Sequence, residues 1–335
     1  MHEYTHVVVY LYGTASLKNQ FVGDVEFICL DHKGWSNLPR TVAKLRAIIR
    51  QKNPVLVHSH LFVSSVIARL ATPKSVPLFT TLHSIFNIDA FQKNKKSLWI
   101  ERLTLKKRHT LIGVTKFVLD DYMKNVSFKG NRFVLYNFLP ENCFQTQTSC
   151  FSSEGLKCVA IGNLKEAKNY NYLLEIFSHL RSTGITLDIY GEGEIKEQLQ
   201  QKIDAGNLPV QLMGEASNVR GIFKDYHLFV QASSHEGFGL SVIEAIAAKL
   251  PVLISDIPVF REITFGHAHF FTLGNPNQAS EIFMHLFKNP AERNKHTEAA
   301  FDYCSEQYSS KIYKQNLISI YNSRPEKDFG LHLVS

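Results

Sequence analysis

The feature that most constrains the fold is a regular alternation of short β-branched runs with longer amphipathic stretches. Leu38, Val42, Leu45 and Ile49 recur at three- and four-residue spacing, as on one face of a helix. The run that contains Val7 to Val9 is apolar at successive positions, which predicts a strand covered on both faces. The predicted strands are residues 5–11, 25–30, 54–58, 77–82, 110–115 and 132–136 in a first series, and 157–161, 185–190, 209–213, 227–231, 251–255 and 268–273 in a second. This pattern predicts an α/β protein with two doubly wound parallel sheets.

The length of 335 residues fits two domains, each of about 150 residues. The polar, unpatterned segment 145–154 separates the two series and is predicted to be the linker. We therefore expect an N-terminal domain at residues 1–147 and a C-terminal domain at 148–309. The last helical pattern has no strand after it, so we expect a C-terminal helix within 310–335 to join the first domain.

The first domain is expected to lack its initial strand–loop–helix unit. An opening parallel strand should lead into a glycine-containing loop and then a helix. Residues 5–11 are followed instead by an irregular stretch up to Val25, with no glycine-rich turn before a helix. Either the unit is missing or the domain begins upstream, and in both cases the sheet should be short of one strand.

Composition excludes several classes of protein. Apolar residues make up 44% and charged residues 20% of the chain, which is typical of globular proteins and not of disordered ones. No stretch approaches the ~20 apolar residues needed to span a bilayer. The five cysteines are scattered, without a Cys-x-x-Cys pair, as in cytoplasmic proteins with reduced thiols and no structural zinc. We therefore expect a cytoplasmic location and no resident metal or cofactor.

The net charge of +7 is unevenly distributed. Residues 1–150 hold 20 Lys and Arg against 9 Asp and Glu, a charge of +11, whereas residues 151–335 hold 17 against 21, a charge of −4. Such a difference indicates two domains with different partners; the alternative is an uneven solvated surface.

A basic segment lies at residues 91–108, where seven Lys and Arg accompany a single acid, Glu101. Leu98, Trp99 and Leu103 are interleaved with them. A basic, amphipathic, Trp-bearing segment can rest on an anionic leaflet, although a solvated helix face explains the charges equally simply. We expect peripheral binding at the inner face of the cell membrane.

The sharpest motif is Ser-Ser-His-Glu-Gly-Phe-Gly-Leu-Ser-Val-Ile-Glu, which follows a predicted strand. Glu236 lies in its loop and Glu244 in the next helix. The N–H groups of Phe238, Gly239 and Leu240 open that helix and can point at an anion. Two carboxylates that accept hydroxyl hydrogens would then flank a phosphate site, as a nucleotide sugar requires. An ordinary strand–turn–helix with surface glutamates is the alternative.

Two further loops follow strands of the second series. The loop after residues 157–161 carries Lys165 and Lys168, and a lysine at the carboxyl end of a parallel strand can neutralise a diphosphate. The turn Gly191-x-Gly193 partly matches the dinucleotide-binding fingerprint but lacks its third glycine. We interpret it as a tight turn that borders the nucleotide site.

Three histidines stand at the ends of predicted strands in the first series. His58 and His60 belong to a Val-His-Ser-His run, and His83 follows the next strand. Open α/β sheets bind ligands at this edge, so His83 is a candidate site residue, whereas His58 is as readily structural. A metal site is the alternative, but no carboxylate or cysteine spacing matches one.

These motifs resemble those of the retaining GT-B glycosyltransferases of family four. The resemblance rests on Gly-x-Leu-(x)3-Lys-Asn, Tyr-Gly-x-Gly, Glu-Gly-Phe-Gly-Leu-(x)3-Glu-Ala and Pro-Val-Leu-x-Ser-Asp-Ile-Pro, and more loosely on Val-His-Ser-His and Thr-Leu-His-Ser. It covers most of residues 50–322. It implies two Rossmann-like domains that face a central cleft, with the activated sugar on the second domain and the acceptor on the first, and no metal.

The resemblance also implies roles for individual residues. Glu236 would contact the donor sugar, Glu244 the ribose and Lys168 the diphosphate, while His83 would face the transferred sugar; Glu236, His83 and Lys168 form the catalytic set. The donor-binding set comprises Asn163, Lys165, Lys168, Gly191, Phe238, Gly239, Leu240 and Glu244. Members of the family usually have Arg where this chain has Asn163, so Lys165 is the expected substitute.

We therefore expect a retaining hexosyltransferase that moves a hexose-type sugar from a nucleotide sugar, with UDP as the favoured nucleotide. The acceptor would be a glycan or a lipid-phosphate-linked glycan of surface polysaccharide synthesis, and no nucleic acid is involved. One alternative is a non-catalytic GT-B paralogue that binds a nucleotide sugar or a partner glycosyltransferase. Another is a dinucleotide oxidoreductase, which is disfavoured because Gly191-x-Gly193 opens no first βαβ unit.

Overall fold

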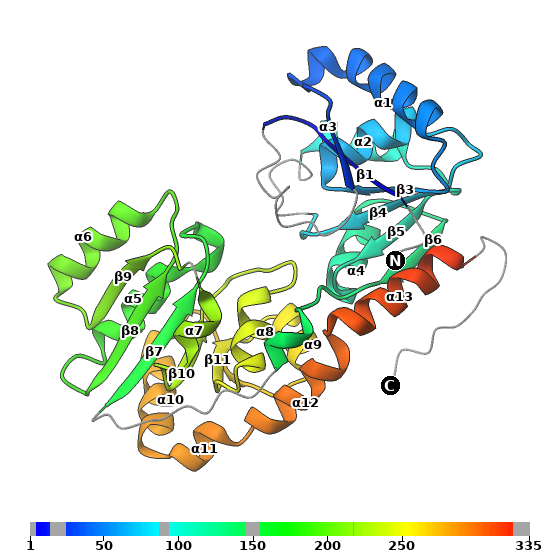
Figure 1. The fold of residues 1–335 in the computed structure, drawn as a ribbon. Helices are drawn as coiled ribbons and strands as arrows, with labels where there is room; N and C mark the ends of the chain where they lie inside the picture. Colours follow the sequence, from blue (N-terminus) through cyan, green and yellow to red (C-terminus); the bar gives the residue numbers. More distant parts are fainter. Residues whose placement is uncertain (1–4, 14–24, 87–93, 145–154, 217, 324–335) are drawn as a thin grey trace. The chain divides into compact units, whose positions relative to one another are not determined.

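The computed structural model describes residues 5–13, 25–86, 94–144, 155–216 and 218–323 (Figure 1). These residues form two compact units, one made of residues up to 113 and 118–134, the other of 114–117 and 135–323. The predicted linker 145–154 lies outside the described residues.

The division between the units differs from the predicted domain boundary. Residues 135–144 and the helix α13 (Ser310–Asn322) group with the second unit, not with the first. The reason is local pairing, because the N–H of Leu139 donates to the carbonyl of Tyr308 at 2.8 Å and Leu139 forms a bridge with Ser309.

The second unit is built on a six-stranded parallel sheet in the order β12-β11-β10-β7-β8-β9. Its strands are β7 (Leu156–Ile161), β8 (Ile185–Tyr190), β9 (Val210–Gly214), β10 (Leu228–Gln231), β11 (Val252–Ser255) and β12 (His269–Phe271). Counted from β7, this is the doubly wound order 3-2-1-4-5-6, which reverses between β7 and β10. The predicted parallel α/β fold is confirmed for this unit.

A large hydrophobic core joins the strands of this sheet to some of the helices that cover it. The helices of this unit include α5 (Tyr170–Ser178), α6 (Lys196–Gly206), α7 (Val219–Phe223), α8 (Leu240–Ala247), α9 (Pro258–Thr264), α10 (Pro276–Lys288), α11 (Pro290–Asn294) and α12 (Thr297–Gln307), with short 3₁₀ turns η3 (Glu141–Phe144) and η4 (Glu166–Lys168). Strands β10 and β11 are buried at every position, as expected for strands covered on both faces.

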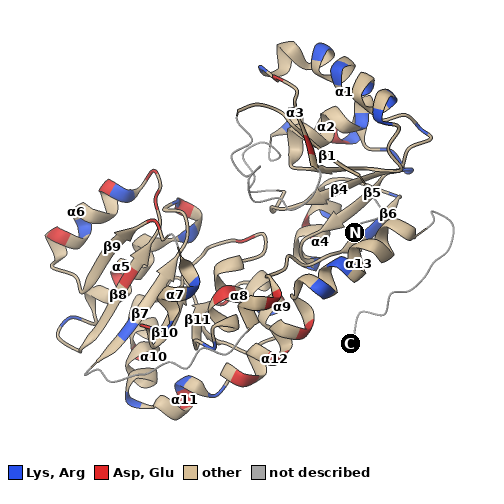
Figure 2. Ribbon diagram, viewed as in Figure 1, with Lys and Arg blue, Asp and Glu red and all other residues tan. Residues whose placement is uncertain are grey.

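The first unit contains two separate parallel ladders, β1-β2 and β3-β4-β5-β6. The strands are β1 (His6–Tyr10), β2 (Val25–Cys29), β3 (Val57–His60), β4 (Leu78–Leu82), β5 (Thr110–Gly113) and β6 (Asn131–Val134). The helices are α1 (Leu38–Lys52), α2 (Phe62–Ala71), α3 (Lys95–Thr104) and α4 (Lys116–Asn125), with a 3₁₀ turn η2 (Trp35–Asn37) before α1. Lys and Arg are spread along α1, which carries part of the predicted positive charge (Figure 2).

Strands β1 and β3 share one core but do not pair with each other among the described residues. Val9 of β1 and Val57 of β3 both pack on the cluster that Leu45 of α1 and Ile67 of α2 form. In a doubly wound sheet of order 3-2-1-4-5-6, a central strand would stand between them. Among the described residues of the first unit no strand occupies that central place, which is consistent with the predicted short sheet.

The gap explains a difference from the predicted burial. Val7, Val8 and Val9 are expected to be covered on both faces, yet each is only half-buried, whereas β4 and β5 are buried at every position. A strand without a neighbour on one side leaves its backbone and the flanks of its side chains open to solvent. The prediction that this strand is covered on both faces is therefore wrong for the described residues, in which β1 pairs only with β2.

The unpaired edges should be visible in amide hydrogen exchange. We expect peptides from β1 and β3 to exchange much faster than those from β4 and β5, because edge amides open without disturbing the rest of the sheet. Exchange followed by mass spectrometry measures this, with β10 and β11 as the fully paired reference. Protection of β1 equal to that of β5 would contradict the gap.

Candidate active site

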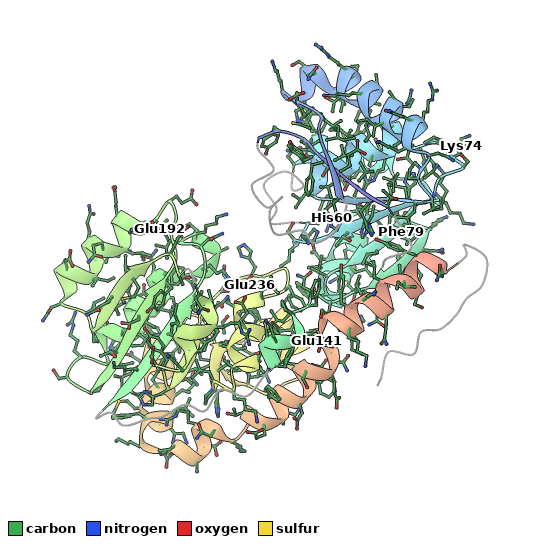
Figure 3. The ribbon with its side chains drawn as sticks, in the orientation of Figure 1. His60, Lys74, Phe79, Glu141, Glu192 and Glu236 are labelled. Atoms are coloured by element: carbon green, nitrogen blue, oxygen red, sulfur yellow. The ribbon has the colours of Figure 1, made fainter. Side chains whose placement is uncertain are left out.

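The two sharpest motifs of the sequence meet at the point where the strand order of the second sheet reverses. Lys168 follows β7, and Glu236, which is labelled in Figure 3, follows β10; the Lys168 Nζ donates to Oε1 of Glu236 at 2.7 Å. The N–H of Ser234 also donates to the carbonyl of Ala167 at 3.0 Å, which joins the two loops. Open α/β sheets bind their ligands outside the strand ends at this reversal.

Glu236 is held through one of its two carboxylate oxygens. Besides Lys168, the Nε2 of Gln231 donates to Oε1 at 2.7 Å and the Ser233 hydroxyl donates to it at 2.8 Å. Gln231 is fixed in turn, because its Oε1 accepts from the Ser241 hydroxyl at 2.8 Å. No described residue donates a hydrogen bond to Oε2, so this oxygen can accept one from a ligand hydroxyl.

Glu244 lies on α8, close to the same lysine. Burial raises the pKa of its carboxyl, and the nearby positive charge of Lys168 opposes that shift. Lys168 therefore lies within electrostatic reach of both predicted carboxylates, which is the arrangement expected of a cation between two groups that bind hydroxyls.

The start of α8 has the geometry expected of an anion-binding helix N-terminus. Gly239 caps the helix with a φ of 97°, and a Cβ at this position would lie 2.8 Å from a ring carbon of Phe260. Both the left-handed backbone and the packing therefore require glycine. Phe238 is buried against the unit, while Leu240, the first residue of the helix, is exposed.

The loop after β7 places the other predicted cation beside Lys168. Lys165 precedes η4, and Asn163 stands two residues earlier. Both side chains are exposed, so neither is fixed before a ligand arrives. Their assignment to donor binding remains a prediction.

Gly191 borders the same loop, and close packing requires a glycine at this position. A Cβ at Gly191 would lie 2.0 Å from the carbonyl oxygen of Gly162, and one at Gly193 would lie 2.3 Å from that of Leu164. The turn therefore sits directly on the β7 loop. It follows β8, the second strand of the sheet, whereas a dinucleotide fingerprint follows the first, so the geometry disfavours an oxidoreductase.

A short segment from the first half of the sequence supports the Glu236 loop. Residues 114–117 belong to the second unit, where the Thr115 hydroxyl donates to the carbonyl of Gly237 at 3.2 Å. The carboxylate of Glu262 accepts from the N–H groups of Lys116 at 2.5 Å and Phe117 at 3.0 Å. Residues 114–117 thus contribute hydrogen bonds to the unit that carries the donor motifs.

The three histidines form a contiguous group in the first unit. Nδ1 of His60 lies 2.9 Å from Nε2 of His83, and the His58 ring stacks on His60 with centroids 4.4 Å apart. Nε2 of His58 lies 2.7 Å from the Thr81 hydroxyl. Burial lowers the pKa of His58 to about 3 and that of His83 to about 4.

No group of three or more His, Cys, Asp or Glu side chains within the described ranges is placed to hold a metal ion. The histidine group thus behaves as a set of neutral, stacked and hydrogen-bonded rings.

Gln231, Ser233, Ser241 and Thr115 are not among the residues predicted to form the site. In the structure Gln231 is a buried polar side chain at the end of the otherwise apolar strand Leu228-Phe-Val-Gln. A buried amide needs hydrogen-bond partners, and here Glu236 is one of them.

Comparison with known families supports the two-part organisation. Residues 148–303 match the model described as "Glycosyl transferases group 1", and residues 3–140 match "Glycosyltransferase Family 4".

Several curated bacterial proteins are similar to parts of the chain. The GtfA subunit of the UDP-N-acetylglucosamine–peptide N-acetylglucosaminyltransferase of Streptococcus agalactiae is 41% identical over 76 residues, 22% of this chain and 15% of the relative. The poly(ribitol-phosphate) alpha-N-acetylglucosaminyltransferase of Staphylococcus aureus is 26% identical over 171 residues, 49% of this chain and 34% of the relative. The Campylobacter jejuni diphospho-undecaprenol 4-alpha-N-acetylgalactosaminyltransferase is 27% identical over 188 residues, which are 55% of this chain and 51% of the relative. These matches span at most about half of each relative.

Solved structures show the same fold at low identity. HepE of Anabaena in complex with UDP and glucose superposes with a TM-score of 0.79 at 15% identity, covering 95% of this chain and 92% of HepE. TarM superposes with a TM-score of 0.72 at 21% identity, covering 84% of this chain and 58% of TarM.

The histidine group generates a prediction for pH-dependent stability. Because the folded-state pKa values of His58 and His83 lie below the value of about 6.5 for an unfolded histidine, the unfolded chain binds protons that the folded chain rejects. The free energy of unfolding should therefore decrease as the pH falls below about 6.5. Urea unfolding near pH 7.5 and near pH 5 measures the decrease. In His58→Gln, whose amide does not titrate, the free energy of unfolding should decrease less over this pH range. An equal decrease in the variant and the parent would contradict the lowered pKa of His58.

Proposed function

The chain belongs to the group 1 glycosyltransferases with the GT-B fold, and on this basis we propose that it is a retaining hexosyltransferase that uses a UDP-sugar as donor. Its acceptor is a glycan or lipid-linked glycan of a bacterial surface polymer. The observation that carries the proposal is the contact of Lys168 with Glu236 where the strand order reverses.

Each part of the donor has a group of the right chemistry in the second unit. The diphosphate binds at Lys168 and the start of α8, where a cation and free N–H groups favour anions. A sugar hydroxyl donates to Oε2 of Glu236, whose other oxygen is already occupied. The ribose hydroxyls donate to Glu244, and Lys165 supplies the charge that the Asn163 position lacks.

The transfer proceeds on one face of the donor sugar. The bond from the anomeric carbon to the diphosphate oxygen breaks, and the acceptor oxygen bonds to the same face of that carbon. The acceptor proton passes to an oxygen of the departing diphosphate, so no separate base is required. The role of Lys168 is then to stabilise the negative charge that develops on the leaving group.

The names of the similar proteins support the proposed classes of donor and acceptor. They include transferases of N-acetylglucosamine and N-acetylgalactosamine, with a peptide, poly(ribitol-phosphate) or a diphospho-undecaprenol glycan as acceptor. UDP-N-acetylglucosamine is therefore the first donor to test, beside UDP-glucose, UDP-N-acetylgalactosamine and a GDP-sugar. Release of UDP and the anomeric configuration of the product by NMR test the proposal; an inverted anomer would refute retention.

We also propose that α3 places the protein on an anionic membrane surface. Trp99 and Leu103 lie four residues apart on one face of the helix and are 64% and 48% exposed. The only acid of the helix, Glu101, points inward and pairs with the buried Arg69 at 2.6 Å. The outer face therefore carries apolar and basic side chains only. No helix in the described part of the chain is long and apolar enough to cross a membrane.

A non-catalytic GT-B protein that binds a nucleotide sugar or a partner glycosyltransferase is the second candidate function. The first unit favours it, because no strand of the described residues lies between β1 and β3, next to the predicted acceptor site. Hydrolysis of the donor separates the two candidates. A chain that binds UDP-sugar but releases no free sugar and forms no product fits the second candidate.

The membrane proposal predicts salt-sensitive binding to anionic vesicles. With Trp35→Phe as background, Trp99 is the only tryptophan, and its fluorescence should shift to the blue when phosphatidylglycerol vesicles are added. Binding should weaken when the salt concentration rises, because each basic residue near the surface contributes about 1 kcal/mol. Trp99→Ala with Leu103→Ala should weaken co-sedimentation. Binding that is independent of anionic lipid and salt would count against this role.

Lys168→Ala should weaken UDP binding by roughly ten- to a hundredfold, because a charge-assisted hydrogen bond contributes about 1.5–3 kcal/mol. Transfer should fall further, since a group facing developing charge is worth about 2.7–4 kcal/mol in the transition state. The fold should persist, because Gln231 and Ser233 still hold Glu236. Isothermal titration measures the binding.

Lys165→Ala, on the same loop, tests whether that lysine replaces the arginine usual at position 163. We expect a smaller loss of UDP affinity than in Lys168→Ala, because the Lys165 side chain is exposed. If both variants bind UDP like the parent, the diphosphate site lies elsewhere.

A further inference from the structure

The first unit contains a histidine pair of which only one member, His83, has a role implied by the family resemblance. His60, which is labelled in Figure 3, is the last residue of β3, and His83 follows the end of β4. The parallel register places His60 opposite Thr81, so His83 lies two residues further along the same face. This geometry brings Nδ1 of His60 within 2.9 Å of Nε2 of His83.

Two imidazole nitrogens at hydrogen-bond distance require a single proton between them. The bond therefore forms between neutral rings, or in a pair that carries only one charge. Burial lowers the pKa of both His60 and His83, so the neutral pair is the state expected at neutral pH. If Nε2 of His83 carries the shared proton, Nδ1 of His83 has a lone pair and accepts hydrogen bonds. If Nδ1 of His60 carries it, Nδ1 of His83 is protonated and donates.

The surroundings indicate which ring donates. His60 stands at the end of β3, where its ring is partly desolvated but the residue as a whole is exposed, so its Nε2–H can donate to water, which leaves Nδ1 as an acceptor. His83 then donates from Nε2–H. Within the described ranges no residue hydrogen-bonds to Nδ1 of His83, and its lone pair is open to a ligand.

We propose that His60 is a positioning residue: by accepting from Nε2–H of His83, it fixes that ring so that Nδ1 presents a lone pair to a sugar hydroxyl. This inference rests on the proposed sugar transfer and on the role that the family resemblance implies for His83, which would face the transferred sugar. The hydroxyl donates to Nδ1, and the tautomer that accepts it is set before the ligand arrives.

The remaining contacts of the group hold the ring of His60 in place. The His58 ring stacks on it with an interplanar angle of 29°, and the Thr81 hydroxyl lies 2.7 Å from Nε2 of His58. Thr81 of β4 therefore holds the ring of His58, the His58 ring holds that of His60, and His60 in turn orients the ring of His83. A pre-oriented acceptor saves the cost of ordering this side chain when the ligand binds.

The tautomer is measured directly by 15N chemical shifts of the histidine rings in the full chain without donor. We expect Nδ1 of His83 to be of the unprotonated, pyridine type and Nε2 to be of the protonated, pyrrole type. His83→Ala and His60→Ala assign the signals by their loss. In His60→Ala, the His83 signals should move towards the average of two exchanging tautomers.

Kinetics with UDP-N-acetylglucosamine then test the consequence. His60→Ala should lower kcat/KM by about five- to tenfold, the usual worth of one hydrogen bond. His60→Asn, whose amide oxygen can take the place of Nδ1, should recover most of the loss. His83→Gln keeps a donor near the Nε2 position but lacks Nδ1, and it should not recover. Thermal unfolding of each variant shows whether the fold is retained.

The outcomes separate this inference from the proposed function. A protonated Nδ1 in His83, a tautomer unchanged by His60→Ala, or equal losses in His60→Ala and His60→Asn would each overturn the positioning role. If the parent chain neither binds nor turns over a UDP-sugar, the proposed function fails. The 15N shifts still decide then whether His60 sets the tautomer of His83.

Discussion

The contact between Lys168 and Glu236 is the interaction on which the donor site depends. The two side chains come from loops 68 residues apart, and only the parallel order that places β7 beside β10 brings the loops together. Both are largely buried, so each charge needs a partner before a ligand is present. Because Lys168, Gln231 and Ser233 all use one oxygen of Glu236, the other remains available, and the site is ordered in advance for a polar ligand.

The two units differ in how completely the strands of their parallel sheets are buried. In the second unit the central strands β7, β10 and β11 are almost completely buried and carry the donor loops on a rigid base. In the first unit the place of the central strand is open, and the side chains of β1 are only half-buried. We therefore expect the first unit to be the less stable of the two, although its histidine group and the buried Arg69–Glu101 pair are well ordered.

The sequence predicts most of the strands well, because central parallel strands are apolar on both faces and turn residues mark their ends. It also singles out Lys168 and Glu236, which stand in loops after such strands, and Glu244 on the helix that follows; their roles in donor binding stay predictions. Gln231 could not be predicted, because one polar residue at a strand end has no periodic signature. The contacts of Thr115 with Gly237 and of His60 with His83 depend on pairing between distant segments. The half-burial of Val7 to Val9 reflects a missing neighbour, which no local pattern contains.

The most direct test of the donor site is a crystal structure of the chain with UDP bound. Our account predicts the diphosphate beside Nζ of Lys168 and the first N–H groups of α8, with the ribose hydroxyls on Glu244. Oε1 of Glu236 should keep its bonds to Gln231 and Ser233. UDP bound away from the loops that follow β7 and β10, or no density for UDP at saturating concentration, would contradict it.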